Sequence, residues 1–362
     1  MTTSTDRGKL ISAGGSWLLE NKATSSDYVR GRIPKTKKVK GRKVTKGYRD
    51  ILEPSPELKQ LQREILEQLR TYGIGIHNAA HAYRANRGIY SMAERHVGKK
   101  KVIRIDLASF FDTVTPVMVL SNLPKAVPKQ LLTLIENWCF LDGKLPQGAP
   151  SSPLLSNVAF FATDVKIQSF VRNWRRRKSP AEDLKPHVND RASAVAYTRY
   201  SDDLVFSSNY VHLNHIIPLI CSIIRKSGFV VNRKKVRKAD ARKERQYVTG
   251  IVVNEKMSAP KDLRRRIRTD LHRMIRDVVT DKCPPLHQVN QQGEIIPLNP
   301  GKVEYPFAKI EGEVRFVESV CPSQAEPLLR RLDVLVDVHT KPHTEWSDET
   351  SAYVSKCQRK SS

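Results

Sequence analysis

Apolar residues recur at two spacings along the chain, and each spacing predicts a different kind of element. Helical spacing of three and four residues runs through 58–69, 128–141, 151–173, 213–227, 261–279 and 307–337. Alternation of apolar and polar residues predicts strands at 101–106, 229–231 and 247–253, and a β-hairpin over 194–207. Strands with flanking helices in this order predict an α+β fold, an antiparallel sheet flanked by helices, followed by a smaller helical domain.

Two of these elements place acidic residues where the strand pattern ends or breaks. The strand over 101–106 ends in Asp106, and Asp202 and Asp203 interrupt the predicted hairpin at its tip. Carboxylates that converge repel one another unless a cation neutralises them, and oxygen-only ligands favour Mg²⁺. Two such ions, about 3.5–4 Å apart, can clamp the attacking and leaving oxygens of a phosphoryl transfer. Asp is also common in tight turns, so an Asp-Asp pair can have a purely structural role. The neighbouring residues are needed to distinguish that role from metal binding.

The chain carries a large positive charge. Its 362 residues include 63 Lys and Arg against 37 Asp and Glu, a net charge of +26. Such an excess strains a compact fold by self-repulsion and is typical of proteins that bind a polyanion, with nucleic acid as the leading candidate. Nine Lys or Arg and no acid lie between Arg30 and Lys46, a run expected to be a solvated arm or a phosphate contact. A merely basic protein without such a partner is the alternative.

The sequence argues against several other classes of protein. No run approaches the roughly 18–20 apolar residues of a membrane span, and the first residues lack the charged-then-apolar layout of a secretory signal. The five Cys form neither a CxxC pattern nor a plausible disulfide framework. We therefore expect a cytoplasmic protein with no membrane segment and no zinc, in a reducing compartment.

Three segments, in order, resemble the catalytic motifs of reverse transcriptases. They are Ile105-Asp106-Leu107-Ala108-Ser109-Phe110-Phe111, Gln147-Gly148-Ala149-Pro150-Ser151-Ser152-Pro153 and Tyr200-Ser201-Asp202-Asp203, which resemble the first catalytic motif, the nucleotide-pocket loop and the Tyr-x-Asp-Asp hairpin. Their spacings, 147 − 106 = 41 and 202 − 147 = 55 residues, follow the family's order. The resemblance implies a right-hand polymerase. Its parts would be a flexible segment at 1–29, fingers at 30–100, a palm at 101–255 with a fingers insertion around 115–195, a helical thumb at 256–340 and a polar tail at 341–362.

The resemblance also implies roles for single residues. Asp106, Asp202 and Asp203 would hold two Mg²⁺ ions, with the backbone carbonyl of Leu107 as a further ligand. The incoming dNTP would be contacted by Arg49, Lys46, Gln147, Gly148 and Lys235, and Phe111 would exclude a ribose 2′-OH. Nucleic acid would be bound by Arg264, Arg265 and Arg268 on the basic helix 261–279, which would lie along an RNA–DNA duplex, and by Arg175 and Arg176. Core packing is the alternative for Phe111, and simple exposure is the alternative for Lys46.

Within the reverse transcriptases, the chain resembles the bacterial retron type. The segment 246–254 contains the Val-Thr-Gly triplet that follows the palm in that family. A retron enzyme would use a structured noncoding RNA as template and primer, start from a 2′-OH and make branched RNA–DNA (msDNA) for anti-phage defence. A separate effector protein and a host RNase H would complete the system.

Two departures from the retron pattern stand in the sequence. Met92 replaces the Asn of an Asn-Ala-x-x-His element, and Ser201 stands where Ala is commoner. A group II intron-like, diversity-generating or other defence-associated reverse transcriptase is therefore the alternative. A non-catalytic RNA-binding scaffold is a further one.

Overall fold

The structure is a computed structural model that describes residues 9–39, 42–177, 195–209, 213–279, 287–289, 295–297, 304–341 and 343–358. Within these ranges only the backbone is described for residues 9–14, 36–39, 42–44, 46, 175–177, 287–289, 295–297, 304–306 and 358. The chain forms two compact units, Met1–Glu244 and Arg245–Ser362, and each has its own apolar core. We describe each unit by itself.

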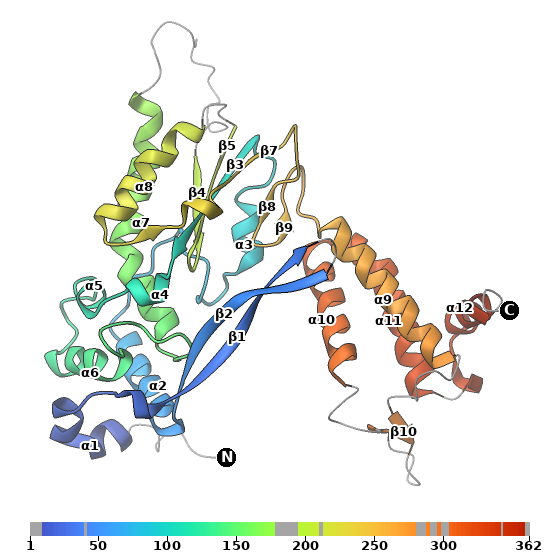
Figure 1. The fold of residues 1–362 in the computed structure, drawn as a ribbon, viewed down its shortest axis with the longest axis horizontal. Helices are drawn as coiled ribbons and strands as arrows, with labels where there is room; N and C mark the ends of the chain where they lie inside the picture. Colours follow the sequence, from blue (N-terminus) through green and yellow to red (C-terminus); the bar gives the residue numbers. More distant parts are fainter. Residues whose placement is uncertain are drawn as a thin grey trace, which may run out of the picture. The chain divides into compact units, whose positions relative to one another are not determined.

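An antiparallel sheet lies at the centre of the first unit (Figure 1). Its strands are β3 (Lys101–Ala108), β4 (Ala196–Tyr200), β5 (Asp203–Ser208), β6 (Val230–Val231) and β7 (Arg237–Asp240). β3 pairs with β5 along one edge and with β6 and β7 along the other, and β4 pairs with β5. The predicted strand over 101–106 and the predicted hairpin over 194–207 are therefore confirmed. The central position of β3 explains why its apolar residues are buried on both faces.

The helices of the first unit cover the predicted amphipathic segments. They are α1 (Lys9–Glu20), α2 (Pro56–Arg70), α3 (Ile89–Glu94), α4 (Phe110–Thr113), α5 (Pro116–Leu120), α6 (Lys129–Cys139), α7 (Ser152–Arg177) and α8 (Ile217–Lys226). Ser55 follows the last residue of the preceding strand and caps α2, because its hydroxyl accepts a hydrogen bond from the amide of Leu58. Pro56 suits the first helical position because its fixed φ is already helical.

The basic run from Arg30 to Lys46 is not a free arm. It lies in a long hairpin of β1 (Tyr28–Val39) and β2 (Arg42–Pro54), in which Ile33 stands opposite Arg49. The sequence analysis missed this hairpin because Lys and Arg interrupt the apolar alternation that marks a strand. A two-stranded ribbon with many cationic side chains is the outcome.

The expectation of a flexible segment over 1–29 is wrong from Lys9 onward. α1 begins there, and Leu18, Ala23 and Tyr28 are buried in the core of the first unit. The indole of Trp138 donates a hydrogen bond to the carbonyl of Leu18 at 2.8 Å. The segment is ordered because these few apolar residues find a partner surface on α6, which a local reading of the sequence does not reveal.

The second unit is mainly helical. It contains β8 (Tyr247–Val248), β9 (Ile251–Val252), α9 (Lys261–Val279), β10 (His287–Val289), β11 (Ile295–Pro297), α10 (Glu304–Val320), α11 (Pro322–Thr340) and α12 (Asp348–Gln358). The predicted single strand over 247–253 is a tight hairpin, because Thr249 and Gly250 both have positive φ (47° and 87°) and form its two-residue turn. β10 and β11 pair with each other in antiparallel fashion.

The polar tail predicted at 341–362 contains a helix in its described part. α12 packs on the core of the second unit through Val354, which is buried. The hydroxyl of Thr350 donates to the Asp337 carboxylate at 2.7 Å and fixes the start of the helix. One apolar residue per turn and a buried polar contact suffice here, although the overall composition of the tail is polar.

Candidate active site

Three carboxylates that are distant in the sequence converge at one end of β3. Asp106 stands opposite Asp203 in the β3–β5 register, so the two side chains leave the same face of the sheet. The amide of Leu107 donates to the carbonyl of Asp202 at 3.0 Å and ties the turn to the strand. Ser201 adopts a left-handed conformation (φ 55°), which costs a residue with a Cβ roughly 1–2 kcal/mol. The fold therefore brings together the residues predicted as metal ligands.

The carboxylates of the hairpin tip are electrostatically strained. Burial raises the pKa of Asp202, and the nearby charge of Asp106 raises it further. Burial also raises the pKa of Asp203, and Arg104, whose Nη2 lies 3.8 Å from the carboxylate, opposes this rise only in part. Like charges held close together in a poorly solvated place favour protonation or the arrival of a cation.

Lys235 lies directly on the first of these acids. The amide of Asn232 donates to the carbonyl of Asp106 at 2.8 Å and holds the short turn over 233–235 beside β3. The Lys235 ammonium donates to Oδ2 of Asp106 at 3.0 Å and lies 2.9 Å from Oδ1. Oδ1 is buried and accepts no hydrogen bond from any residue in the described part of the chain.

The donors at this end of β3 fit Mg²⁺. Hard carboxylate oxygens are the ligands that this ion prefers, and a divalent ion would offset the mutual repulsion of the three acids, which Lys235 and Arg104 offset only in part. Across the described ranges no three His, Cys, Asp or Glu side chains already stand at the mutual distances of metal ligands. The ammonium of Lys235 supplies positive charge beside Asp106 in this arrangement.

The predicted nucleotide-pocket loop lies against the basic hairpin. The amide of Leu52 in β2 donates to the carbonyl of Gln147 at 2.7 Å. Gly148 has φ 121°, and a Cβ there would lie 2.7 Å from the carbonyl oxygen of Leu52. Only glycine fits, and the close neighbour that requires it is this strand. Arg49, in the same strand, is exposed, and it lies near enough to Asp202 to oppose the rise that burial causes in the pKa of that carboxyl.

Two adjacent aromatic residues follow the first motif. Phe110 is buried in the core of the first unit, and Phe111 is partly buried and packs against the same core. Their ring centroids are 5.6 Å apart in an edge-to-face arrangement. Both belong to α4, which begins after Ser109, another residue with a left-handed backbone (φ 45°). Phe111 thus keeps an accessible surface within five residues of Asp106.

Some predicted contacts lie outside what the structure describes. Lys46 belongs to β2, and Arg175 and Arg176 belong to the last turn of α7, but their side chains are not described.

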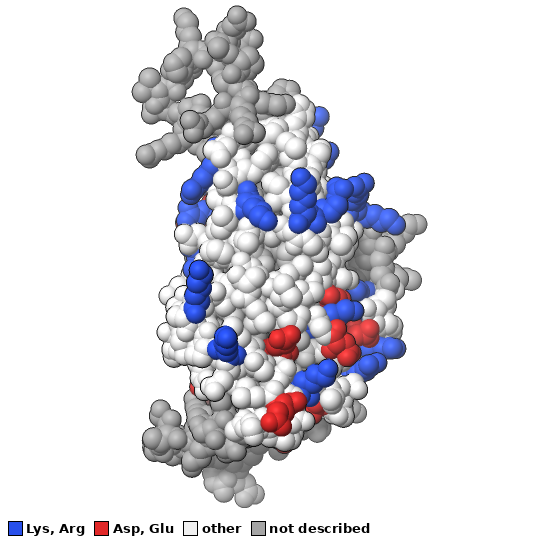
Figure 2. All heavy atoms as spheres, turned by 90° about the vertical axis from the view of Figure 1, so that its left-hand side faces the viewer, with Lys and Arg blue, Asp and Glu red and all other residues white. Residues whose placement is uncertain are grey.

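Figure 2 shows one face of the molecule, on which Lys and Arg side chains lie across the upper middle while the visible Asp and Glu gather toward the lower right. The positive charge is therefore not spread evenly over this face.

The basic helix α9 separates its arginines into two groups. Arg266 pairs with Glu313 at 2.9 Å, and Arg273 and Arg276 each pair with an Asp of the same helix. Arg265 and Arg268 are exposed, and neither has a carboxylate partner among the described residues. Arg264 is partly buried, and its Nε donates to the carbonyl of Ala259 at 3.3 Å. The exposed, unpaired members are among those predicted to contact phosphates.

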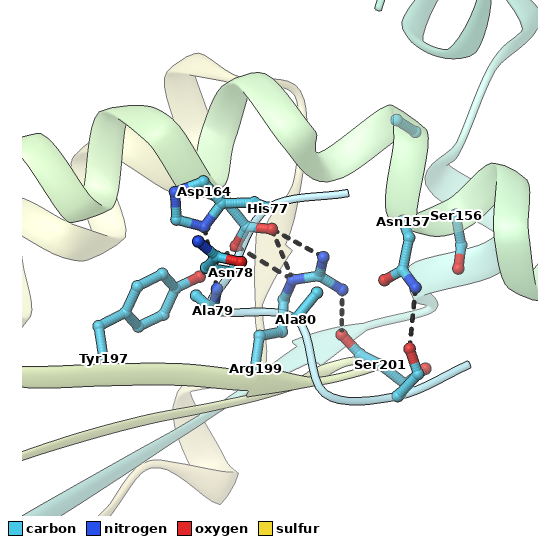
Figure 3. Close-up of polar contacts among 12 residues, drawn as sticks. His77, Asn78, Ala79, Ala80, Ser156, Asn157, Asp164, Tyr197, Arg199 and Ser201 are labelled. Carbon is cyan, nitrogen blue, oxygen red and sulfur yellow. Dashed lines mark hydrogen bonds and ion pairs between the residues drawn. The ribbon is translucent and has the colours of Figure 1, made fainter. Parts of the chain in front are cut away.

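Sequence reasoning missed the polar groups behind the hairpin. The ring of His96 bridges β4 and β5, with Nδ1 2.7 Å from the Ser207 hydroxyl and Nε2 2.6 Å from the Thr198 hydroxyl. Arg199 in β4 pairs with Asp164 in α7, and both are buried (Figure 3). A polar residue at helical spacing within an apolar helix was the available signal for Asp164, but the sequence alone names no partner.

Comparison with known proteins places this site in a family. The family model described as "Reverse transcriptase (RNA-dependent DNA polymerase)" matches residues 33–252, which is more than half of the 362 residues. The chain therefore belongs to the reverse transcriptase family, and its central sheet and flanking helices are the palm and fingers of that family's fold.

The curated relatives are retron enzymes, so the predicted resemblance to that type is confirmed. The chain is similar to the Retron Ec83 reverse transcriptase of Escherichia coli, with 29% identity over 62% of this chain and 71% of that protein. It is also similar to the Retron Mx65 and Mx162 reverse transcriptases of Myxococcus xanthus, at 28% and 27% identity over 79% and 86% of this chain. It spans 61% of the length of each of these two proteins.

A solved structure of a foamy viral protease-reverse transcriptase in complex with RNA/DNA hybrid matches 99% of this chain and 37% of that chain. Its TM-score is 0.43 and its identity 15%, and this likeness is too low to carry an argument. Among the described helices, none has the length and apolar character needed to cross a lipid bilayer.

Proposed function

We propose that this chain is an RNA-directed DNA polymerase that extends a primer by two-metal nucleotidyl transfer. The observation that carries the proposal is the convergence of Asp106 with the Asp202-Asp203 turn, beside the cations Lys235 and Arg49. Membership of the reverse transcriptase family supports RNA as the template. Two Mg²⁺ ions, when bound, would lower the pKa of the primer hydroxyl and hold the pyrophosphate oxygens.

The residues around the carboxylates have complementary tasks. Asp106 and Asp202 would hold the two Mg²⁺ ions together with the backbone carbonyl of Leu107, and Asp203 would support the primer end. The planar guanidinium of Arg49 suits a bidentate grip on the triphosphate. Lys235 is close enough to Asp106 to move onto the leaving pyrophosphate.

The other predicted pocket residues complete the nucleotide site. Phe111 excludes a ribose 2′-OH by its bulk, and its partly accessible ring supports this role. Gln147 and Gly148 line the pocket from the loop held by β2, and Lys46 in that strand assists at the triphosphate.

The finer biology follows the retron relatives. The enzyme would start DNA from a 2′-OH of a cognate structured noncoding RNA and make branched RNA–DNA for anti-phage defence in the cytoplasm. A separate effector protein and host RNase H would act with it. In this reading the fingers are residues 30–100, the palm 101–255 with an insertion around 115–195, and the thumb 256–340.

The thumb would hold the product duplex. Its helix α9 carries the exposed Arg265 and Arg268 together with Arg264. Cations without a carboxylate partner are free to neutralise phosphates, and each such contact releases counterions. Arg175 and Arg176 would add a second RNA contact at the end of α7.

The direct test is incorporation of labelled dNTP on an RNA template by the purified protein with Mg²⁺. We expect the unmodified protein to be active and Asp202→Asn to be inactive. Asp142→Asn is the matched control, because this exposed turn residue undergoes the same chemical change and lies outside the three catalytic motifs. Retained synthesis in Asp202→Asn would contradict the assignment and leave a non-catalytic RNA-binding scaffold as the better interpretation.

The retron assignment has a separate test. Nucleic acid that copurifies with the protein from its host should contain short DNA joined to RNA through a 2′–5′ branch. A linear product with an ordinary 3′ primer would favour a group II intron-like, diversity-generating or other defence-associated enzyme instead.

A further inference from the structure

The strand that precedes the catalytic turn, β4, contributes one partner of a fully buried ion pair, and α7 contributes the other. The side chains of Arg199 in β4 and Asp164 in α7 are both 0% exposed. The Arg199 Nη2 donates to Oδ2 of Asp164 at 2.8 Å, and Nε donates to Oδ1 at 3.1 Å. This two-pronged geometry uses the planar fork of the guanidinium (Figure 3).

The same guanidinium also reaches the catalytic turn. Its Nη1 donates to the backbone carbonyl of Ser201 at 3.1 Å. Ser201 directly precedes Asp202 and holds the left-handed conformation that turns the chain (φ 55°). One rigid side chain therefore connects a carboxylate of α7 with the residue that sets the direction of the two aspartates after it.

The ion pair itself is held on several sides. The Tyr197 hydroxyl donates to Oδ1 of Asp164, and the Phe160 ring lies 4.7 Å from the Arg199 guanidinium carbon. Phe160 and Asp164 are four residues apart and share one face of α7. Although burial alone would lower the pKa of Arg199, the carboxylate of Asp164 raises it above its ordinary value, so the pair stays charged.

The backbone of Arg199 is fixed as well. Its amide donates to the carbonyl of Ala79 at 2.7 Å, and its carbonyl accepts from the amide of His81 at 2.8 Å. The segment that contains Ala79 and His81 continues to Ala82, whose carbonyl accepts a hydrogen bond from the Asn157 side chain in α7. The backbone from which the Arg199 guanidinium extends is therefore fixed by hydrogen bonds of both its amide and its carbonyl.

Stability alone does not account for this arrangement. A buried ion pair is commonly no more stabilising than apolar residues of the same volume, because desolvation of the two charges cancels their attraction. An apolar pair would fill the space but would leave the Ser201 carbonyl without its donor. The third hydrogen bond of Arg199 is the part that only a guanidinium supplies.

We propose that Arg199, held by Asp164, is a positioning residue that sets Asp202 and Asp203 at the separation from Asp106 that metal binding requires. The inference rests on the proposed function, since it assigns these aspartates to the metal site. A displacement of about 1 Å in such a site can lower a rate on the order of 100-fold. The Arg199–Asp164 pair with its hydrogen bond to Ser201, which we call the clamp, can therefore control the rate from outside the metal site.

The test replaces the pair by apolar residues of similar size, because one charge left alone in this place could prevent folding. Asp164→Leu with Arg199→Met is built on a Tyr197→Phe background, and Tyr197→Phe alone is the matched control, which keeps the clamp. We expect the triple variant to fold and to bind an RNA–DNA duplex as the control does. Its single-turnover rate of nucleotide addition should fall about 100-fold, and the Mg²⁺ concentration for half-maximal rate should rise several-fold. A folded triple variant with the rate and Mg²⁺ dependence of the control would overturn the proposal.

A second variant covers the case in which the triple variant does not fold. Arg199→Lys keeps a charge for Asp164 but has a single ammonium in place of the fork, so it loses the donor to Ser201. We expect the same two changes in smaller measure, and an unchanged Mg²⁺ dependence would overturn the proposal. Asp202→Asn is measured in parallel. Activity retained in that variant would contradict the proposed function itself, whereas an inactive Asp202→Asn beside an unaffected clamp variant would contradict this inference alone.

Discussion

The tip and the body of the β4–β5 hairpin treat negative charge in opposite ways. Beside the body, Asp164 of α7 receives hydrogen bonds from Arg199 and Tyr197 in β4 and is fully buried. At the tip, burial and mutual repulsion raise the pKa values of Asp202 and Asp203, and Oδ1 of the neighbouring Asp106 accepts no hydrogen bond from a described residue. Asp164 is therefore fully paired within the fold, whereas Lys235 and Arg104 offset the negative charge at the tip only in part.

This contrast separates two meanings of a buried carboxylate. Removing a satisfied charge leaves its partner without compensation in a low-dielectric place. Removing one of several repelling charges relieves the fold and harms only the chemistry.

Asp106→Asn should remove most of the activity without cost to the fold. Loss of one bridging carboxylate forfeits several kcal/mol of transition-state stabilisation, a fall of about 10³-fold or more in single-turnover rate. The melting temperature should stay the same or rise, since repulsion at the tip decreases. Calorimetry and rapid-quench incorporation check both parts, and a large loss of melting temperature would show that Asp106 is a scaffold residue.

Asp164→Asn should behave in the opposite way, with a large effect on stability. It leaves the guanidinium of Arg199 buried without a counter-charge, so the free energy of unfolding should fall by about 3–5 kcal/mol. Urea unfolding of the full chain measures this, with Asp203→Asn as the control that should not be destabilised. Equal losses of unfolding free energy in Asp164→Asn and Asp203→Asn would contradict the distinction between tip and body.

The pH dependence of stability should report on the body of the hairpin. Burial lowers the pKa of His96 from 6.5 to about 3, so the folded protein resists protonation that the unfolded chain accepts. This contribution is fully present above pH 6.5 and is lost as pH falls toward 3, at about 1 kcal/mol between pH 6.5 and 5.5. His96→Gln should flatten the slope in urea unfolding, and an unchanged slope would contradict the assignment of this pH dependence to His96.

The smallest expected effects lie on α9, where the same contrast applies to cations. Arg265→Ala should lower the slope of log affinity for RNA–DNA duplex against log salt by about one, because an unpaired arginine can neutralise a phosphate. Arg266→Ala should leave the slope nearly unchanged, since Arg266 already pairs with Glu313. Equal slopes for both variants would contradict a phosphate contact at Arg265.

The sequence predicts the acids at the hairpin tip, but it does not predict the buried ion pair beside the hairpin body. The tip acids stand in short motifs at strand ends, and the helices with a clean apolar stripe, such as α2 and α9, were predicted nearly to their ends. Asp164 and Arg199 lie far apart in the sequence, and a lone polar residue in an apolar stretch does not name its partner. α1 and α12 were missed for a related reason, because their few apolar residues gain meaning only from the surface that they cover.

The central claim is that the three aspartates hold paired divalent ions at a DNA end. The most direct measurement counts Mn²⁺ ions by electron paramagnetic resonance in a complex of the protein with RNA template, dideoxy-terminated primer and incoming dNTP. The account predicts two bound ions in the unmodified protein and the loss of at least one in Asp106→Asn. The same number of ions in both proteins would contradict it.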